Sequence, residues 1–129
     1  MTMMSSKLKA LVFSDVHLYH DKTKTEHIVL GLRSALADTE KLRDIDIIFI
    51  SGDLFDHSVF MPNKDTHFVI NFIYHLLNMC AKYDIVLRVL EGTPSHDWKQ
   101  SKLIIDINNN RPDPVDVKHA VNLSIEHID

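Results

Sequence analysis

The chain has 129 residues, 45% hydrophobic and 25% charged, which suits one globular domain with an apolar core. Its net charge of −4 excludes the overall basic surface that many nucleic-acid-binding domains carry. The single cysteine, Cys80, excludes an internal disulfide framework. The amino end lacks an apolar signal core, and no apolar run reaches membrane length. We therefore expect a cytoplasmic protein that has no contact with a membrane.

Short apolar runs separated by amphipathic segments predict strands alternating with helices. The runs are Leu8–Phe13, Ile45–Ile50 and Ile85–Leu90. The central run is β-branched and aromatic and too short to form a helix of its own. Helical spacing of apolar residues predicts one helix over Thr25–Arg43, with Thr25 as its cap, and a second over about Lys64–Tyr83. The order β-α-β-α-β predicts an α/β fold with a parallel core sheet, right-handed crossovers and helices on both faces.

The pattern is weaker after Trp98. Gln100–Ile107 is compatible with a short helix, and Asn108–Pro114 is typical of a polar turn region. Val121–Ile128 alternates apolar and polar residues, which predicts a half-buried strand. No segment has the composition of a linker between domains, so we expect residues 1–129 to form a single domain.

Acidic and histidine residues follow each of the three predicted strands. They are Asp15 and His17, then Asp53 and Asp56, then His96 and Asp97. Ligands of open α/β sheets bind at the carboxyl ends of the strands, so we expect these side chains to converge. Carboxylate and imidazole groups suit manganese, iron or zinc, and Asp53, at the tip of the central strand, could bridge two metals. The pattern favours a metal site over the alternative that these residues only stabilise turns.

These motifs resemble those of the calcineurin-like metallophosphoesterases, whose pattern is DxH, GDxxD and GNH[D/E], each after a strand. Asp15-Val16-His17 and Gly52-Asp53-Leu54-Phe55-Asp56 match the first two. The sequence GDLFD, followed by a proline and a predicted long apolar helix, is most similar to the corresponding segment of DNA double-strand-break-repair exonucleases and their phage-encoded relatives. The resemblance covers about Leu8–Trp98. It implies that the chain forms half of a metallophosphoesterase sandwich.

The resemblance also implies a role for each site residue. Asp15 and His17 would bind the first of two divalent ions, expected to be Mn²⁺, and Asp53 would bridge to the second. His96 would contact the scissile phosphate and assist the leaving oxygen. Asp56 would hold the tautomer of His96 and favour its charged form. The implied activity is hydrolysis of phosphodiester bonds by a DNA exonuclease or endonuclease of repair or recombination.

The third motif departs from the family pattern. It reads Gly-Thr-Pro-Ser-His-Asp over residues 92–97, so that Ser95 takes the place of the asparagine that would bind the second metal. A hydroxyl is a poorer ligand than an amide carbonyl. We therefore expect weak binding of the second ion unless Thr93 or Glu91 contributes.

The family's further metal-binding histidines, including a Gly-His-x-His motif, lie downstream of the third motif, and the chain ends at Asp129 first. We therefore expect an amino-terminal part of a longer enzyme or a truncated gene product. His119 and His127 are the less favoured candidates for completing the site from within. On this count of ligands, we expect residues 1–129 alone to bind manganese weakly and to show little or no nuclease activity, and a carboxyl-terminally extended form to cleave DNA.

Other functions remain open. One is a small-nucleotide phosphodiesterase, and another is a non-catalytic fragment that binds metal poorly and dimerises through the Phe68–Cys80 helix or holds a partner. A protein phosphatase is disfavoured, because GDLFDH lacks the Arg-Gly that follows GDxxD in that branch. The partners considered are DNA as substrate, a second copy of the chain and an ATPase subunit. His67 and His75, in the second predicted helix, are interpreted as residues at its boundary with solvent.

Overall fold

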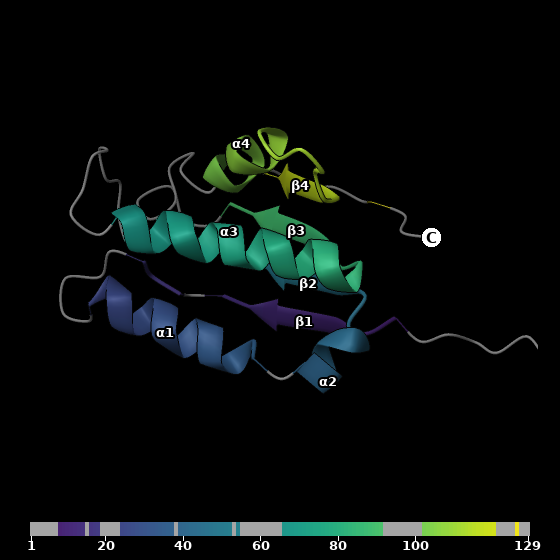
Figure 1. Cartoon of the computed structure of the whole chain (residues 1–129), viewed down its shortest axis with the longest axis horizontal. Coiled ribbons are helices and arrows are strands. Elements are labelled where there is room, and N and C mark those ends of the chain that lie inside the picture. The colour runs from purple at the N-terminus through teal and green to yellow at the C-terminus, as the bar shows by residue number, and fades with distance from the viewer. Residues whose placement is uncertain are drawn as a thin grey trace, which may run out of the picture.

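A computed structural model of the chain describes residues 8–14, 16–18, 24–37, 39–52, 54, 66–91, 102–120 and 126. Strands alternate with helices along this part of the chain (Figure 1). The elements are β1 (Ala10–Phe13), α1 (Thr25–Ala35), α2 (Thr39–Arg43), β2 (Ile47–Ile50), α3 (Thr66–Tyr83), β3 (Val86–Leu90), α4 (Leu103–Asn109) and β4 (Val117–Ala120). None of these helices is long and apolar enough to cross a membrane.

The described strands form one parallel sheet in the order β1-β2-β3-β4. Near the carboxyl ends, Phe13 pairs with Ile50, Ile50 with Val89, and Val89 with His119. The carboxyl ends of all these strands therefore lie at one edge of the sheet (Figure 1). The predicted α/β class is confirmed, and so is the prediction that the three apolar runs are parallel neighbours.

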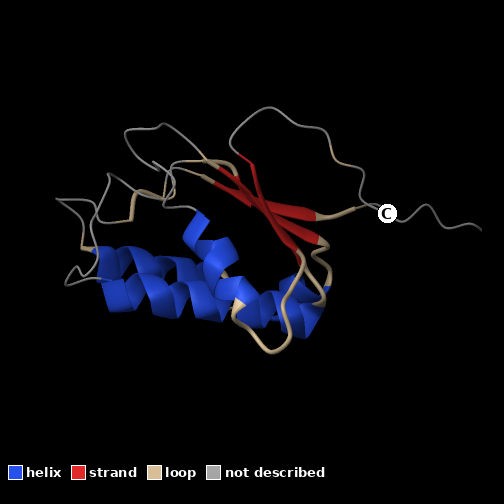
Figure 2. Cartoon of the chain, turned by 90° about the horizontal axis from the view of Figure 1, so that it is seen from above, coloured by secondary structure: helices blue, strands red, loops and turns tan. Residues whose placement is uncertain are grey.

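All of the described helices lie on one face of the sheet (Figure 2). The expectation of helices on both faces is therefore wrong for this part of the chain. The strand order follows the chain order, and crossovers between parallel strands are almost always right-handed. Crossovers of one hand that always step in the same direction place every helix on the same side. Helices on both faces need a strand order that reverses, as in doubly wound sheets.

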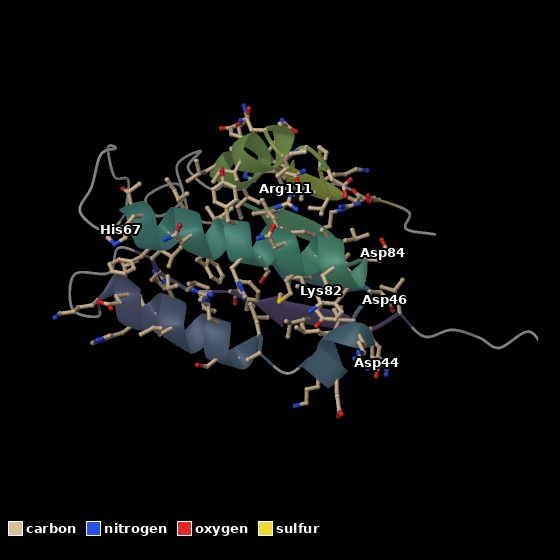
Figure 3. The ribbon with its side chains drawn as sticks, in the orientation of Figure 1. Asp44, Asp46, His67, Lys82, Asp84 and Arg111 are labelled. Carbon is tan, nitrogen blue, oxygen red and sulfur yellow. The ribbon has the colours of Figure 1, made fainter. Side chains whose placement is uncertain are left out.

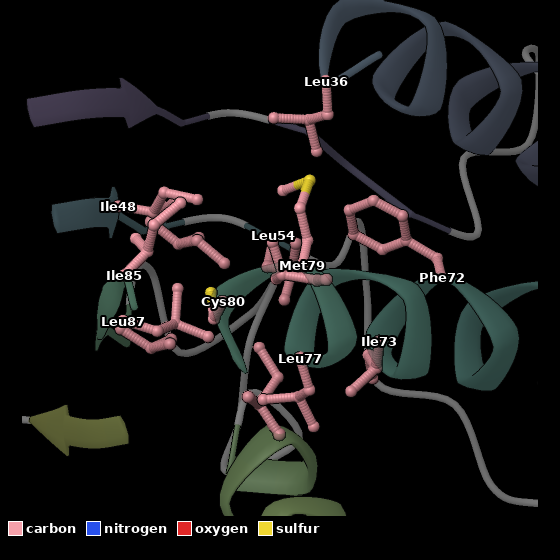
Figure 4. Close-up of a cluster of buried hydrophobic side chains, with 14 of the residues drawn as sticks. Leu36, Ile48, Leu54, Phe72, Ile73, Leu77, Met79, Cys80, Ile85 and Leu87 are labelled. Atoms are coloured by element: carbon pink, nitrogen blue, oxygen red, sulfur yellow. The ribbon is translucent and has the colours of Figure 1, made fainter. Parts of the chain in front are cut away.

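The core lies between this helix layer and the sheet (Figure 4). Alternate strand residues point into it, as the two-residue period of a strand requires. On β2 and β3 these are Ile48, Ile50, Leu87 and Val89. From α3 the buried side chains are Val69, Phe72, Ile73, Leu76, Leu77, Met79 and Cys80. The apolar face of α3, which the sequence offered as a dimerisation surface, is thus used inside the molecule.

The opposite face of the sheet carries exposed apolar side chains and one network of charges. Val12, Phe49 and Leu90 are 57%, 38% and 43% exposed. Arg88 of β3 donates two hydrogen bonds to the carboxylate of Glu126, of 2.6 and 2.7 Å, and one of 2.9 Å to Asp116. A buried guanidinium is tolerated only when its charge is paired in this way. The network therefore fixes Glu126 against the middle of this face.

The first predicted helix is two helices in the structure, with a break after Ala35. Leu36 and Leu42 are both 4% exposed. Residues six apart on one continuous helix lie about 240° apart around its axis, so the break allows both leucines to enter the core. Thr25 is the first helical residue, and Lys24, which makes no side-chain capping bond, takes the cap position.

The region after α3 also differs from the sequence prediction. The short helix lies at Leu103–Asn109 instead of Gln100–Ile107, and β4 occupies a segment for which no strand was predicted. The Asn108 side chain donates to the Val115 carbonyl (2.9 Å) and accepts from the Val115 N–H (3.0 Å), which ties the end of α4 to the start of β4. The predicted strand Val121–Ile128 lies outside the described residues, except for Glu126.

Candidate metal centre

The loops that follow β1 and β2 are held side by side at the carboxyl edge of the sheet. The Ser51 N–H donates to the Phe13 carbonyl (3.0 Å), and the Leu18 N–H donates to the Leu54 carbonyl (2.8 Å). Leu18 and Leu54 are 0% and 1% exposed, so both anchors are seated in the core. In the chain, the two bonds flank the first motif, residues 15–17, whereas in the second motif Leu54 is itself the middle residue of GDxxD. The backbone frame of the site is therefore a pair of adjacent, doubly joined loops.

Both loops contain a residue with a positive φ angle. Gly52, which is buried, has a φ of 112°, and His17 has a φ of 54°. The φ of Gly52 lies in a region that is sterically favourable only for glycine. The φ of His17 lies in the left-handed region, which histidine adopts more often than most residues do. Such backbone conformations gather at ligand sites, where neighbouring structure maintains them.

His17 is the one predicted site residue within the described part of the chain. Its side chain is half-buried and interacts with neighbouring groups, and its Nδ1 atom is shielded from solvent. The other predicted residues lie outside the described residues. These are the predicted metal ligands Asp15, Asp53 and Ser95 and the predicted catalytic residues Asp56 and His96. Among the described residues, no three His, Cys, Asp or Glu side chains form a group that could hold a metal ion.

Other titratable residues lie at both edges of the sheet. Asp44, Asp46 and Asp84 lie near the amino ends of the strands, away from the motif loops (Figure 3). His119 occupies the second-to-last position of β4, two strands across from Ile50 in the same row. Adjacent strands are about 4.8 Å apart, so His119 stands about 10 Å from the end of β2 along this row.

No family model, curated protein or solved structure matches this chain.

The resemblance to metallophosphoesterases therefore rests on the sequence motifs and their spacing alone. The donors in the first two motifs, carboxylates and one imidazole, fit a divalent ion such as Mn²⁺. Within the described residues, His17 is the donor whose placement at the carboxyl edge agrees with that fit. His67, interpreted from the sequence as a boundary residue, is exposed near the start of α3, with its ring centre 3.9 Å from that of Phe68.

Sequence reasoning did not single out Leu18 and Leu54, which hold the frame of the site together. Each follows directly after a motif residue, in Asp-Val-His-Leu and in Gly-Asp-Leu. An apolar residue inside an otherwise polar loop was the available signal, because it indicates a loop that turns back into the core.

Proposed function

We propose that the chain is a metal-dependent phosphoesterase that acts on DNA as an exonuclease or endonuclease and uses two divalent ions, expected to be Mn²⁺. The observation that carries this proposal is the pairing of the loops after β1 and β2 by two backbone hydrogen bonds. These loops carry the DxH and GDxxD motifs at the sheet edge where parallel α/β proteins bind ligands. Adjacent loops of this kind suit a shared carboxylate, the role given to Asp53.

The residues of the chain would have two roles, binding the ions and holding a proton near the leaving oxygen. Asp15, His17 and Asp53 would hold the ions, with Ser95 as a weak additional ligand of the second. When bound, the ions would supply an activated water and neutralise charge that develops on the phosphoryl group. His96 would hold a proton at the leaving oxygen. Asp56 would accept a hydrogen bond from His96, which fixes its tautomer and favours its protonated form.

The proposal extends to the fold, in which this sheet would form half of a metallophosphoesterase sandwich. The face of the sheet away from the helices exposes Val12, Phe49 and Leu90. Face-to-face packing of a second sheet covers side chains of this kind. DNA as substrate and an ATPase partner subunit belong to the same proposal and follow from the resemblance alone, and a cytoplasmic location is proposed with them.

A second candidate is a fragment that binds metal poorly and has a structural or partner-binding role. Ser95, at the position where the family has asparagine, favours it. Loss of a single supporting group can lower metal affinity about 10- to 100-fold, and here a direct ligand is replaced. The two candidates differ in metal affinity and in phosphodiester cleavage, which can be measured separately.

The first test is manganese binding, followed by paramagnetic broadening of the histidine ring signals in NMR spectra. We expect the His17 signal to broaden first, and Asp53→Asn to weaken the binding by at least about tenfold. Asp84→Asn is the matched control. It removes the same charge at the opposite edge of the sheet, at a residue with a φ of 55°, which asparagine also tolerates. Equal broadening in both variants would reject the metal centre.

The second test is Mn²⁺-dependent cleavage of linear DNA and of a small phosphodiester. We expect slow cleavage by the chain, faster cleavage by Ser95→Asn, and none by Asp53→Ala or His96→Ala. Manganese binding at His17 without cleavage in any variant would support the non-catalytic candidate. Cleavage of the small diester alone would point to a nucleotide phosphodiesterase.

A further inference from the structure

A groove of about 430 Å³ lies between α1, α2 and the second half of α3. It is formed where α1 and α3 end, and the motif loops lie at the other end of these helices (Figure 1). Its volume falls within the range of about 300–1,000 Å³ that is typical of small-molecule sites. The groove is therefore separate from the candidate metal centre and large enough for a ligand.

The floor of the groove is apolar. Leu36, Leu42 and Met79, one from the end of each helix, line it and are 4%, 4% and 7% exposed. Their side chains belong to the hydrophobic core. Because these three side chains are already almost fully buried, a ligand would gain free energy only from the small apolar area of the lining that still faces the hollow.

The charges on the walls have one sign. Arg33 of α1 and Lys82 of α3 line the groove together with His75, and none of the described lining residues is acidic. Lys82 lies on the side of α3 that faces α2 (Figure 3). In a chain with a net charge of −4, two permanent cations beside one apolar floor make a local positive field.

The pKa of His75 is lower than that of a free histidine. Burial lowers the pKa of His75, and the positive charge of Arg33 lowers this pKa further. The imidazole is therefore neutral at pH 7, and the groove keeps Arg33 and Lys82 as its permanent charges. An anion placed between them would offset the effect of Arg33 on His75.

Arg33 and Lys82 also lie in the last turns of their helices, where a cation interacts favourably with the helix dipole. This interaction is equally favourable at any position around the last turn, so it does not explain why both cations border the same apolar hollow. A charged group facing an apolar floor is the arrangement that ligand sites use to orient a molecule.

We infer that this groove binds a small amphiphilic anion, with an apolar body on Leu36, Leu42 and Met79 and a carboxylate, sulfonate or phosphate group between Arg33 and Lys82. A hollow of this volume suits such a molecule better than a long helix of a protein partner. The inference is independent of the proposed phosphoesterase activity.

The test compares two dyes of the same shape. 1-Anilinonaphthalene-8-sulfonate carries an anionic group, and N-phenyl-1-naphthylamine has the same rings without it. We expect the sulfonate to bind more tightly, as measured by fluorescence titration, and to weaken with added salt. NMR spectra should show changes at Arg33, His75 and Lys82, together with an upward shift of the pKa of His75.

Charge-removing variants supply the second measurement. Arg33→Gln and Lys82→Gln should each weaken binding of the sulfonate by about twofold to fivefold and leave binding of the neutral dye unchanged. Lys24→Gln is the control, because it removes the same charge from an exposed residue at the other end of α1.

Three results would overturn the inference. One is equal affinity for the two dyes, and another is insensitivity of sulfonate binding to Arg33→Gln and Lys82→Gln. The third is a change of the same NMR signals when protein concentration rises without dye, which would assign the groove to a second copy of the chain.

Discussion

Gly52, in the loop after β2, has a backbone conformation that residues with a side chain rarely adopt. Its φ of 112° is accessible to glycine and strained for any residue with a side chain. The Ser51 N–H beside it donates to the Phe13 carbonyl, so the chain leaves β2 paired to the end of β1. At this position, glycine lets the loop turn without breaking that hydrogen bond.

The first residue-scale prediction concerns Gly52→Ala. We expect it to lower the free energy of unfolding by about 1–3 kcal/mol, the usual range for a strained backbone residue, as measured by urea denaturation. Gly31→Ala is the matched control. Gly31 lies in α1, and a Cβ atom added there would have nothing within 4 Å, so alanine should stabilise by about 0.5–1 kcal/mol. Equal effects of the two substitutions would contradict the strained turn.

The strand β3 differs from the other described strands in that one of its residues, Arg88, carries a charge and is buried. The guanidinium pairs with Glu126 and with Asp116, while Lys118 of β4 donates to the same Glu126 carboxylate (2.8 Å). The hydrogen bond from Arg88, and then that from Lys118, lowers the pKa of Glu126 from 4.5 to about 2. The carboxylate thus stays charged in the folded protein at acidities where it is protonated in the unfolded chain.

The element-scale prediction follows from the sign of this shift. A carboxyl group whose pKa is lower in the folded state stabilises the fold above its unfolded pKa, and this contribution disappears as the pH falls toward the folded value. For Glu126 this loss runs from about pH 4.5 to about pH 2. We expect Glu126→Gln to reduce the acid dependence of the urea midpoint in this window.

The control for this prediction is Asp44→Asn. The Asp44 carboxylate lies 3.7 Å from Lys9 Nζ, and both side chains are more than 60% exposed, so this ion pair contributes little. We expect Asp44→Asn to leave the acid dependence nearly unchanged. An unchanged profile in Glu126→Gln would show that the pairing with Arg88 does not contribute to stability.

At the scale of the whole molecule, the core lies between one helix layer and one parallel sheet, and we expect such a core to open as a unit. Cys80 of α3 is 1% exposed within this core. Burial raises the pKa of its thiol from 9.0 to about 12, although nearby Arg111 acts in the opposite direction. The thiolate is the reactive form of cysteine. In the native protein Cys80 is therefore protected in two ways, because reagents cannot reach the buried sulfur and because the thiol stays protonated.

The whole-molecule prediction is that Cys80 reacts with iodoacetamide at pH 8 only when the core opens. We expect the labelling rate to follow the free energy of global unfolding, rising steeply with urea and reaching the rate of a free thiol in the unfolded chain. A core substitution such as Leu76→Ala, expected to destabilise by about 2–5 kcal/mol, should accelerate labelling in proportion. Tyr74→Ala, at a residue 45% exposed on the same helix, should not. Fast labelling of the unaltered protein would contradict a closed core.

The sequence by itself determined the first three strands and their direction. Ile47, Ile48 and Ile50 could be recognised as a strand because a short β-branched run is buried whatever surrounds it. Amphipathic helices between such runs require parallel neighbours. Parallel strands, in turn, place the segments that follow them at one edge, and the bonds from Leu18 to Leu54 and from Ser51 to Phe13 agree with that expectation. The metal centre itself remains a prediction from the motifs.

Tertiary structure alone decided features that depend on contacts between distant residues. The helices share one face because the strand order follows the chain, and no local pattern reveals strand order. β4 is stabilised by its pairing with β3 and by the Asn108 side chain, so its own short sequence gave little signal. The burial of Arg88 likewise depends on partners far along the chain, Asp116 and Glu126. Periodicity reports which side of an element is buried, and only the folded chain determines what it is buried against.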